Sequence, residues 1–173
     1  MRIVICRYDE YSEAILAILN DAIVTSTALF DYRPRELTSM VEWFRAKELR
    51  QFPVLGAVAD DGSLRGFATY GAFRNWPAYK YTVEHSVYVH RDHHRQGVAR
   101  ALLTSLITTA EQQDYHVMVG GIDATNAASI ALHVELGFAL AGKIHHAGFK
   151  FGRWLDLEFY ELRLRTPTQP VDG

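Results

Sequence analysis

The segment from His90 to Arg100 holds the residues whose types and spacing best suggest binding chemistry. It reads HRDHHRQGVAR and follows the apolar run Val87-Tyr88-Val89. The residues after Gly97 follow helical spacing, so the segment predicts a strand, a loop and a helix start. Amides at a helix start lack intrahelical partners and carry partial positive charge, which attracts anions. The pattern predicts an anion site; a solvated basic loop is the alternative.

The residues of the same loop also indicate which kinds of phosphate-binding motif are excluded. Arg95 and Arg100 could add charge-assisted hydrogen bonds to a phosphate, and the small Ala99 leaves room for close approach. The segment contains neither the GxxxxGK[ST] of a nucleotide-triphosphate loop nor the full GxGxxG of a dinucleotide fold. A different phosphate-bearing ligand is therefore expected.

The composition predicts one globular domain over residues 1–165, followed by a proline-containing, disordered tail over 166–173. The net charge of −2 argues against nucleic acid or an anionic membrane as a partner. A single cysteine, Cys6, excludes an internal disulfide framework, and none of the eight histidines shows metal-site spacing with an acidic partner, so we expect no metal. No apolar run approaches the ~20 residues of a membrane span, and we expect a cytoplasmic protein.

Hydrophobic periodicity predicts an alternation of strands and helices around these segments. Ser39 and Glu42 form an S-x-x-E capping box, which predicts that the second helix opens there, and Gly137 is expected just after the end of the last helix. The expected fold class is α/β (α+β), a mixed sheet covered by helices. The predicted strands are 2–8, 54–59, 64–73, 81–90, 117–122, 138–144 and 154–164, and the predicted helices are 11–23, 40–50, 97 onward and 126–136.

Several segments resemble one known family. HRQGVA resembles the Q/R-x-x-G-x-G/A pyrophosphate motif of the GNAT superfamily of acetyl-CoA-dependent N-acetyltransferases, with His94 at the Q/R position and Ala99 at the last glycine. NAASIALHVELGF resembles the asparagine–helix–GF element that follows it. TVEHSVYV, NAASIALHVELGF and GFKFGRWLDL are similar to the phosphinothricin and methionine sulfoximine/sulfone acetyltransferase branch. The resemblance covers residues 1 to about 165.

The resemblance implies a mostly antiparallel mixed sheet, splayed between strands 4 and 5 and flanked by helices. It also implies acetyl-CoA as co-substrate. The backbone of Val87, Tyr88 and Val89 would pair with the pantetheine arm, and Asn126 and Ser129 would bind that arm from the far side. The pyrophosphate would be held by Arg95, Gln96, Gly97, Val98, Ala99 and Arg100.

Acetyl transfer to an amine needs a base, because an ammonium group has no lone pair with which to attack. Glu84 is the candidate, since a carboxylate is out of character in its apolar strand and the branch carries a glutamate at the matching position; a solvent-facing glutamate is the alternative. The resemblance assigns His133, seven residues after Asn126, as proton donor to the departing thiolate, with a structural histidine as the alternative. Cys6 stands apart from these motifs, so we expect direct attack in a ternary complex.

The acceptor is expected to be a small anionic amine. Arg74 could grip a carboxylate or phosphinyl oxygen, and the branch uses this arginine together with Asn75 and Trp76 for its amino-acid substrate. By analogy, Phe30 and Tyr32 would wall the pocket, with ordinary packing as the alternative for these aromatic residues.

The expected reaction is acetylation of the α-amine of methionine sulfoximine, methionine sulfone or phosphinothricin, and the resemblance implies a homodimer. The alternatives are an N-acetyltransferase for another amine (a protein N-terminus, a polyamine or an aminoglycoside) and a CoA-binding module without turnover.

Overall fold

The computed structural model describes residues 1–172 and contains a sheet with the strand order β1-β2-β3-β4-β5-β7-β6. The pairs β1–β2, β2–β3, β5–β7 and β6–β7 are antiparallel, and the pair β4–β5 is parallel. With its helices, this arrangement confirms the predicted α/β (α+β) class with a mixed, mostly antiparallel sheet.

Contacts between residues divide the chain into two compact units. Unit 1 comprises residues 1–70 and 86–106, and unit 2 comprises residues 71–85 and those from 107 on. Each unit draws on two stretches of the chain, so the chain passes between the units more than once. A single N-acetyltransferase domain over 1–165 stays a prediction.

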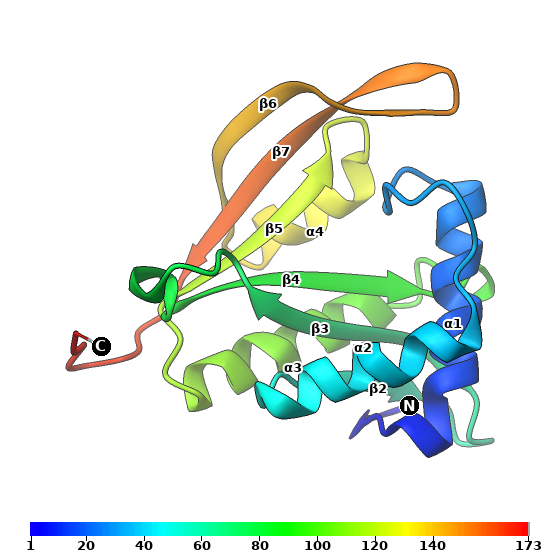
Figure 1. Ribbon diagram of the computed structural model, residues 1–173, viewed down its shortest axis with the longest axis horizontal. Helices are drawn as coiled ribbons and strands as arrows, with labels where there is room; N and C mark the ends of the chain where they lie inside the picture. Colours follow the sequence, from blue (N-terminus) through cyan, green and yellow to red (C-terminus); the bar gives the residue numbers. More distant parts are fainter. Residues whose placement is uncertain (173) are drawn as a thin grey trace. The chain divides into compact units, whose positions relative to one another are not determined.

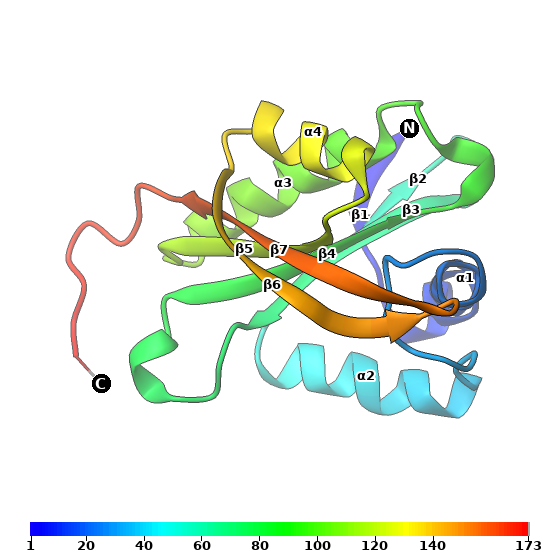
Figure 2. The ribbon, with the colours of Figure 1, turned by 90° about the horizontal axis from the view of Figure 1, so that it is seen from above.

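Unit 1 is built on its strands, with helices on both faces. Figure 2 shows α1 and α2 on one side of β2 and β3, and the start of α3 on the other. The elements that begin in unit 1 are β1 (Arg2–Ile5), α1 (Tyr8–Thr25), α2 (Leu37–Leu49), β2 (Val54–Val58), β3 (Leu64–Ala72), the 3-10 turn η2 (Arg91–His93) and α3 (Val98–Gln112).

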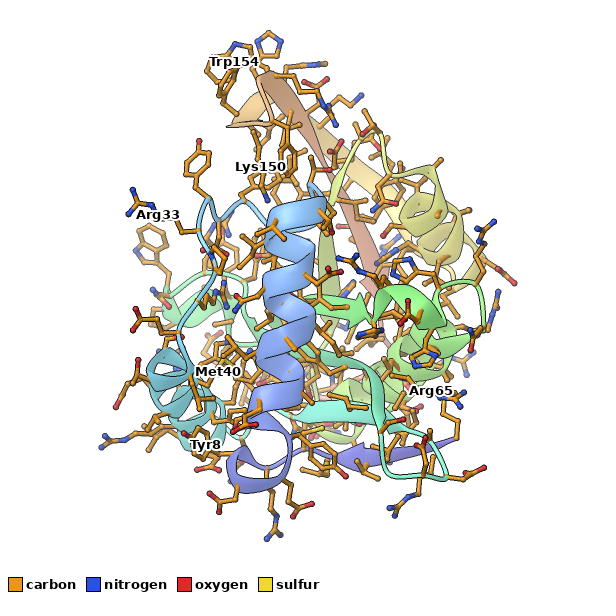
Figure 3. The ribbon with its side chains drawn as sticks, turned by 90° about the vertical axis from the view of Figure 1, so that its right-hand side faces the viewer. Tyr8, Arg33, Met40, Arg65, Lys150 and Trp154 are labelled. Atoms are coloured by element: carbon orange, nitrogen blue, oxygen red, sulfur yellow. The ribbon has the colours of Figure 1, made fainter. Side chains whose placement is uncertain are left out.

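The two faces of β3 show why this unit folds around it. Successive strand residues point to opposite faces. Phe67 is fully buried and packs edge-on against Trp43 of α2, with ring centroids 6.2 Å apart. Gly66 faces the other way, toward Val98 of α3. In Figure 3, Met40 of α2 lies in the core beside α1.

Unit 2 is built around β7, which pairs with both β5 and β6. Figure 1 shows α4 running alongside β5 and β7, and Figure 3 shows Lys150 and Trp154 at the end of the β6–β7 hairpin. The elements that begin in unit 2 are the 3-10 turn η1 (Pro77–Tyr79), β4 (Thr82–Val89, which ends in unit 1), β5 (Val117–Asp123), α4 (Ala127–Glu135), β6 (Ala139–Lys150) and β7 (Arg153–Arg163).

The pairing of β4 with β5 stops partway along both strands. Its register runs from Thr82, opposite Val117, to His85, opposite Gly120. Both strands continue past that rung, β4 to Val89 and β5 to Asp123. This early end of the parallel pairing agrees with the splay expected between the fourth and fifth strands.

Several predicted boundaries are wrong, including that of the strand predicted over 138–144, which runs on to Lys150 in β6, while Gly137 is confirmed after the end of α4, with a φ of +91°. Helix α2 begins at Leu37, with Glu36 in the capping position. Ser39 therefore lies inside the first turn, and its hydroxyl donates to the Glu36 carbonyl oxygen at 2.6 Å, a local bond that competes with capping. The first strand ends at Ile5 because α1 already begins at Tyr8.

The chain after β7 makes several hydrogen bonds. The Thr166 hydroxyl donates to the Tyr115 carbonyl oxygen at 2.6 Å, and the Val171 amide donates to the Tyr81 hydroxyl oxygen at 3.1 Å. The disorder expected for 166–173 stays a prediction for residues 166–172, and residue 173 lies outside the described residues. Within residues 1–172, no helix combines the length and apolarity needed to cross a membrane.

Gly66→Ala is predicted to destabilise the protein. A Cβ at Gly66 would lie 2.7 Å from the Tyr88 carbonyl oxygen and 3.1 Å from the Val89 Cα. Because backbone cannot yield as a flexible side chain can, we expect a loss of about 1–3 kcal/mol in the free energy of unfolding. Urea denaturation measures it. The control is Gly142→Ala, where a Cβ meets nothing within 4 Å; equal effects of the two variants would contradict the packing argument.

Candidate active site

Glu84 lies in the part of β4 that belongs to unit 2, among apolar neighbours. A Cβ at Gly121 of β5 would lie 3.4 Å from Glu84 Oε1, 3.5 Å from Leu157 and 3.7 Å from Phe159. The carboxylate thus occupies space that the glycine leaves open beside two apolar side chains. Burial raises the pKa of Glu84, and the positive charge of Arg74 opposes that rise. A raised pKa makes a carboxylate a better base.

Arg74 follows β3 and approaches Glu84 from a neighbouring loop. Its Nη1 atom lies 4.0 Å from Glu84 Oε2 and donates to the Phe73 carbonyl oxygen at 2.6 Å. The guanidinium also lies over the Phe73 ring, 4.1 Å from its centroid. A hollow of about 360 Å³ is lined by residues 72–76, and these include Asn75 and the largely exposed Trp76. The structure therefore brings the predicted base together with Arg74, one of the predicted acceptor-binding residues, and places Asn75 and Trp76 beside Arg74 in the hollow.

His133 lies on the other face of the same strands. Glu84 and His85 are consecutive in β4 and project to opposite faces, and His133 of α4 stacks on His85 with ring centroids 5.0 Å apart. Their Nε2 atoms are 3.1 Å apart. A Cβ at Gly120 would lie 2.6 Å from His85 Nε2 and 3.2 Å from His133 Nε2, so this glycine makes the contact possible.

The hydrogen bonds of this histidine pair fix its tautomers. His133 Nδ1 lies 2.7 Å from the Ser129 carbonyl oxygen, which can only accept, so Nδ1 carries the proton. In the neutral ring, His133 Nε2 is then an acceptor, and His85 must donate to it from Nε2. His85 Nδ1 is left as a buried acceptor without a hydrogen-bond partner among residues 1–172.

Burial disfavours the charged form of both histidines. Burial, together with the positive charge of His133, lowers the pKa of His85 to about 3. Burial also lowers the pKa of His133, although the Ser129 carbonyl oxygen favours the charged form. His85 was not among the residues predicted for the site; an imidazole in an apolar strand next to Glu84 was the signal that could have identified it.

The other predicted residues of α4 form its N-terminal cap. The Asn126 side-chain oxygen accepts from the Ser129 amide at 3.1 Å. Before it, Asp123 Oδ1 accepts from the amide and the hydroxyl of Thr125, both at 2.8 Å. The loop that delivers Asn126 and Ser129 is thereby held to the end of β5. Asn126, Ser129 and His133 lie together along α4.

The predicted anion loop lies in unit 1. Arg95 and Gly97 both have positive φ, +59° and +77°, and Val98 then begins α3. The backbone thus turns sharply before the helix start, which glycine tolerates at no cost. His94 Nε2 donates to the Val89 carbonyl oxygen at 3.0 Å. The histidine at the motif's Q/R position therefore ties the loop to the end of β4.

The remaining predicted positions of the loop and the pocket wall differ in exposure. Val98 is buried, Ala99 is half-buried, and Gln96 and Arg100 are exposed. Phe30 is 39% exposed and Tyr32 is 73% exposed, in the segment between α1 and α2. Two exposed aromatic rings are consistent with a binding wall and do not belong to the buried core.

Comparison with known proteins identifies the family. Residues 15–138 match the Acetyltransferase (GNAT) family, so the chain belongs to the GNAT acetyltransferases. An L-methionine sulfoximine/L-methionine sulfone acetyltransferase of Pseudomonas paraeruginosa is 45% identical over 150 residues, 87% of each chain. A phosphinothricin N-acetyltransferase of Alcaligenes faecalis is 37% identical over 150 residues, 86% of this chain and 75% of that one.

Solved structures give the same result. An acetyltransferase structure from Acinetobacter baylyi matches with a TM-score of 0.98 and 55% identity, covering 99% of this chain and 96% of that one. One from Salmonella typhimurium, solved with its cofactor acetyl-CoA, matches with a TM-score of 0.93 and 39% identity, covering 99% and 98%. The GNAT resemblance predicted from the motifs is confirmed.

The buried histidine pair predicts a specific loss of stability in acid. In the unfolded chain both groups titrate near the ordinary value of 6.5, whereas in the folded protein their pKa values are lowered. The unfolded state therefore binds more protons below about pH 6.5, and stability falls as the pH falls. Between pH 7.5 and 5, His85→Leu should reduce the pH slope of the unfolding free energy by up to about 1.4 kcal/mol per pH unit.

Urea denaturation at several pH values measures this slope. Phe138→Leu, which trims a ring packed against both histidines without removing a titratable group, serves as the control and should keep the slope of the unmodified protein. A slope that is unchanged in His85→Leu would mean that His85 is not held neutral in the folded state.

Proposed function

We propose that the protein transfers the acetyl group of acetyl-CoA to the α-amine of a small anionic amino-acid analogue, such as methionine sulfoximine, methionine sulfone or phosphinothricin. The observation that carries this proposal is the contact of Glu84 with Arg74, whose side chain belongs to the lining of the hollow. A guanidinium suits an acceptor's carboxylate, and a partly desolvated carboxylate suits its ammonium group. The names of the similar proteins support the same reaction.

In the proposed reaction, Glu84 takes a proton from the acceptor's ammonium group, directly or through a water. The free amine attacks the thioester carbonyl carbon in a ternary complex. A nitrogen–carbon bond forms and the carbon–sulfur bond breaks; the extra proton on the attacking nitrogen passes, directly or through water, to the departing sulfur, so that CoA leaves as the thiol. A backbone N–H near Val87 would stabilise the oxyanion of the intermediate.

Acetyl-CoA would be held by the residues that the family motif marks. The backbone of Val87, Tyr88 and Val89 would bind the pantetheine arm, with Asn126 and Ser129 as further partners. The residues from Arg95 to Arg100 would hold the pyrophosphate, because Gly97 and the start of α3 present amides to an anion. The solved complex of a similar protein with acetyl-CoA supports acetyl-CoA as the co-substrate.

We do not retain His133 as the source of a proton for the thiolate. Its Nδ1–H is held by the Ser129 carbonyl oxygen and its Nε2 by His85, and the buried ring lies on the strand face opposite Glu84, so a structural role is the better proposal. Among the alternative functions, a polycationic acceptor is disfavoured by Arg74 at the hollow, and a module without turnover is disfavoured by Glu84, whose pKa is raised by partial burial. A cytoplasmic location is proposed from the composition alone.

We also propose a homodimer that uses the β6–β7 hairpin of unit 2. β6 is at the edge of the sheet, and most of its residues are exposed. Exposed edge strands with apolar side chains favour association with another chain. The large apolar residues that are 46–58% exposed there are Leu140, Ile144, Phe149, Phe151 and Trp154.

Glu84→Gln is predicted to lower kcat/KM at least about 100-fold while leaving the affinity for acetyl-CoA nearly unchanged, since an amide cannot accept the proton. Assays of CoA thiol release with the three candidate amines measure the first quantity, and calorimetry measures the second. Glu161→Gln, on the same sheet face, is the control and should keep full activity. Full activity of Glu84→Gln would remove Glu84 from the mechanism, and no thiol release with any of the amines would reject the acceptor class.

Ile144→Glu is predicted to convert the dimer to a monomer, because it places a charge in the proposed apolar interface. Light scattering coupled to size-exclusion chromatography gives the mass. Val134→Glu, an equally exposed apolar position on α4, should remain dimeric. A monomeric unmodified protein would contradict the proposed assembly.

A further inference from the structure

Arg74 is placed to bind two different carboxylates. Its Nη1 atom lies 4.0 Å from Glu84 Oε2, and its guanidinium belongs to the lining of the hollow. The side chain is anchored by the Phe73 carbonyl oxygen and by the Phe73 ring. It is also 46% exposed, so its remaining N–H groups can reach an incoming anion. A planar guanidinium prefers two parallel hydrogen bonds to one carboxylate, which the 4.0 Å contact with Glu84 does not provide.

The surroundings of Glu84 make Arg74 the charge that matters most for it. A Cβ at Gly121 would meet Glu84 Oε1, Leu157 and Phe159, so the two other side chains around that point carry no charge. The register places Glu161 on the same face of the sheet at the rung of Glu84, two strands away, and it places Asp123 and Arg163 on that face at other rungs. Of the charged groups, Arg74 is the one whose field acts on Glu84 and opposes the effect of burial.

We propose that Arg74 is shared between Glu84 and the acceptor's own carboxylate, so that binding of an anionic acceptor draws the guanidinium away from the base. This inference rests on the proposed function. In the free enzyme, Arg74 stabilises the ionised form of Glu84 and so weakens it as a base. Once the acceptor's carboxylate forms two hydrogen bonds with the guanidinium, Glu84 keeps its apolar surroundings but no longer has the positive charge of Arg74 beside it. The affinity of the Glu84 carboxylate for a proton therefore rises.

The consequence concerns specificity. An acceptor with a carboxylate would be bound and would also activate the base, whereas a neutral amide of the same acceptor would leave Arg74 on Glu84. Arg74 would thus discriminate between acceptors in the chemical step as well as in binding, which is how an enzyme gains specificity beyond affinity. Arg74 would be a specificity-determining residue for the reaction that Glu84 performs.

The test is a direct titration of Glu84 by carbon-13 NMR in protein labelled at the glutamate carboxyl carbons, with the Glu84 signal assigned from its absence in Glu84→Gln. The probe is N-acetyl-methionine sulfone, which carries the carboxylate but no ammonium group, and its carboxamide is the matched control. We expect the N-acetyl acid, at saturation, to raise the pKa of Glu84 by about half a pH unit or more. The carboxamide should leave it unchanged. Arg74→Gln without ligand should already show the raised value.

The outcomes separate the two proposals. Saturable binding of the acid to the unmodified protein without a rise in the pKa of Glu84 would overturn the sharing of Arg74 and leave the acceptor class intact. An unchanged pKa of Glu84 in Arg74→Gln would overturn it in the same way. No binding of the acid at millimolar concentration would overturn the proposed acceptor class together with this inference.

Discussion

The candidate site depends on the alternation of side chains at one point of β4. Glu84 and His85 are neighbours in sequence, and the strand sends them to opposite faces. On one face, the carboxylate lies beside Gly121 and Arg74. On the other, His85 packs on His133 above Gly120, at the last rung where β4 pairs with β5. A shift of one residue in this register would exchange a base and a buried imidazole.

Two consecutive glycines of β5 lie against this pair of residues. Gly120 leaves space for the contact between the two histidine rings, because a Cβ there would lie 2.6 Å from His85 Nε2. A Cβ at Gly121, on the opposite face, would lie 3.4 Å from the Glu84 carboxylate, which is ordinary van der Waals contact. Gly120 is therefore the glycine on which the arrangement depends.

The sequence allowed much of this to be predicted, because the informative residues lie in contiguous motifs. Periodicity identified the order of the elements, and the motif around Gly97 identified the family. Glu84 and Arg74 were also predicted, and the structure places them 4.0 Å apart. Local patterns predicted the ends of helices and strands less reliably. The Ser39 hydroxyl, for example, can form a hydrogen bond inside the first turn of α2 as well as at a capping position, so its presence did not fix where the helix begins.

Interactions between distant segments could not be predicted from spacing. His85 and His133 are separated by 48 positions, and their contact depends on how α4 packs on β4 and β5. The tautomer of His133 follows from the Ser129 carbonyl oxygen and from His85 together, so the motif alone could not reveal it. Likewise, the effect of Arg74 on Glu84 arises because a loop after β3 returns to β4.

The central claim is that Glu84 removes a proton from the bound acceptor's ammonium group, and the pH dependence of kcat/KM tests it most directly. The account predicts a plateau that begins above a pKa higher than the ordinary glutamate value of 4.5 and extends to the pKa of the amine. A tenfold rise in kcat/KM per pH unit that continues without a plateau up to the pKa of the amine would contradict it, because only amine already deprotonated in solution would then react.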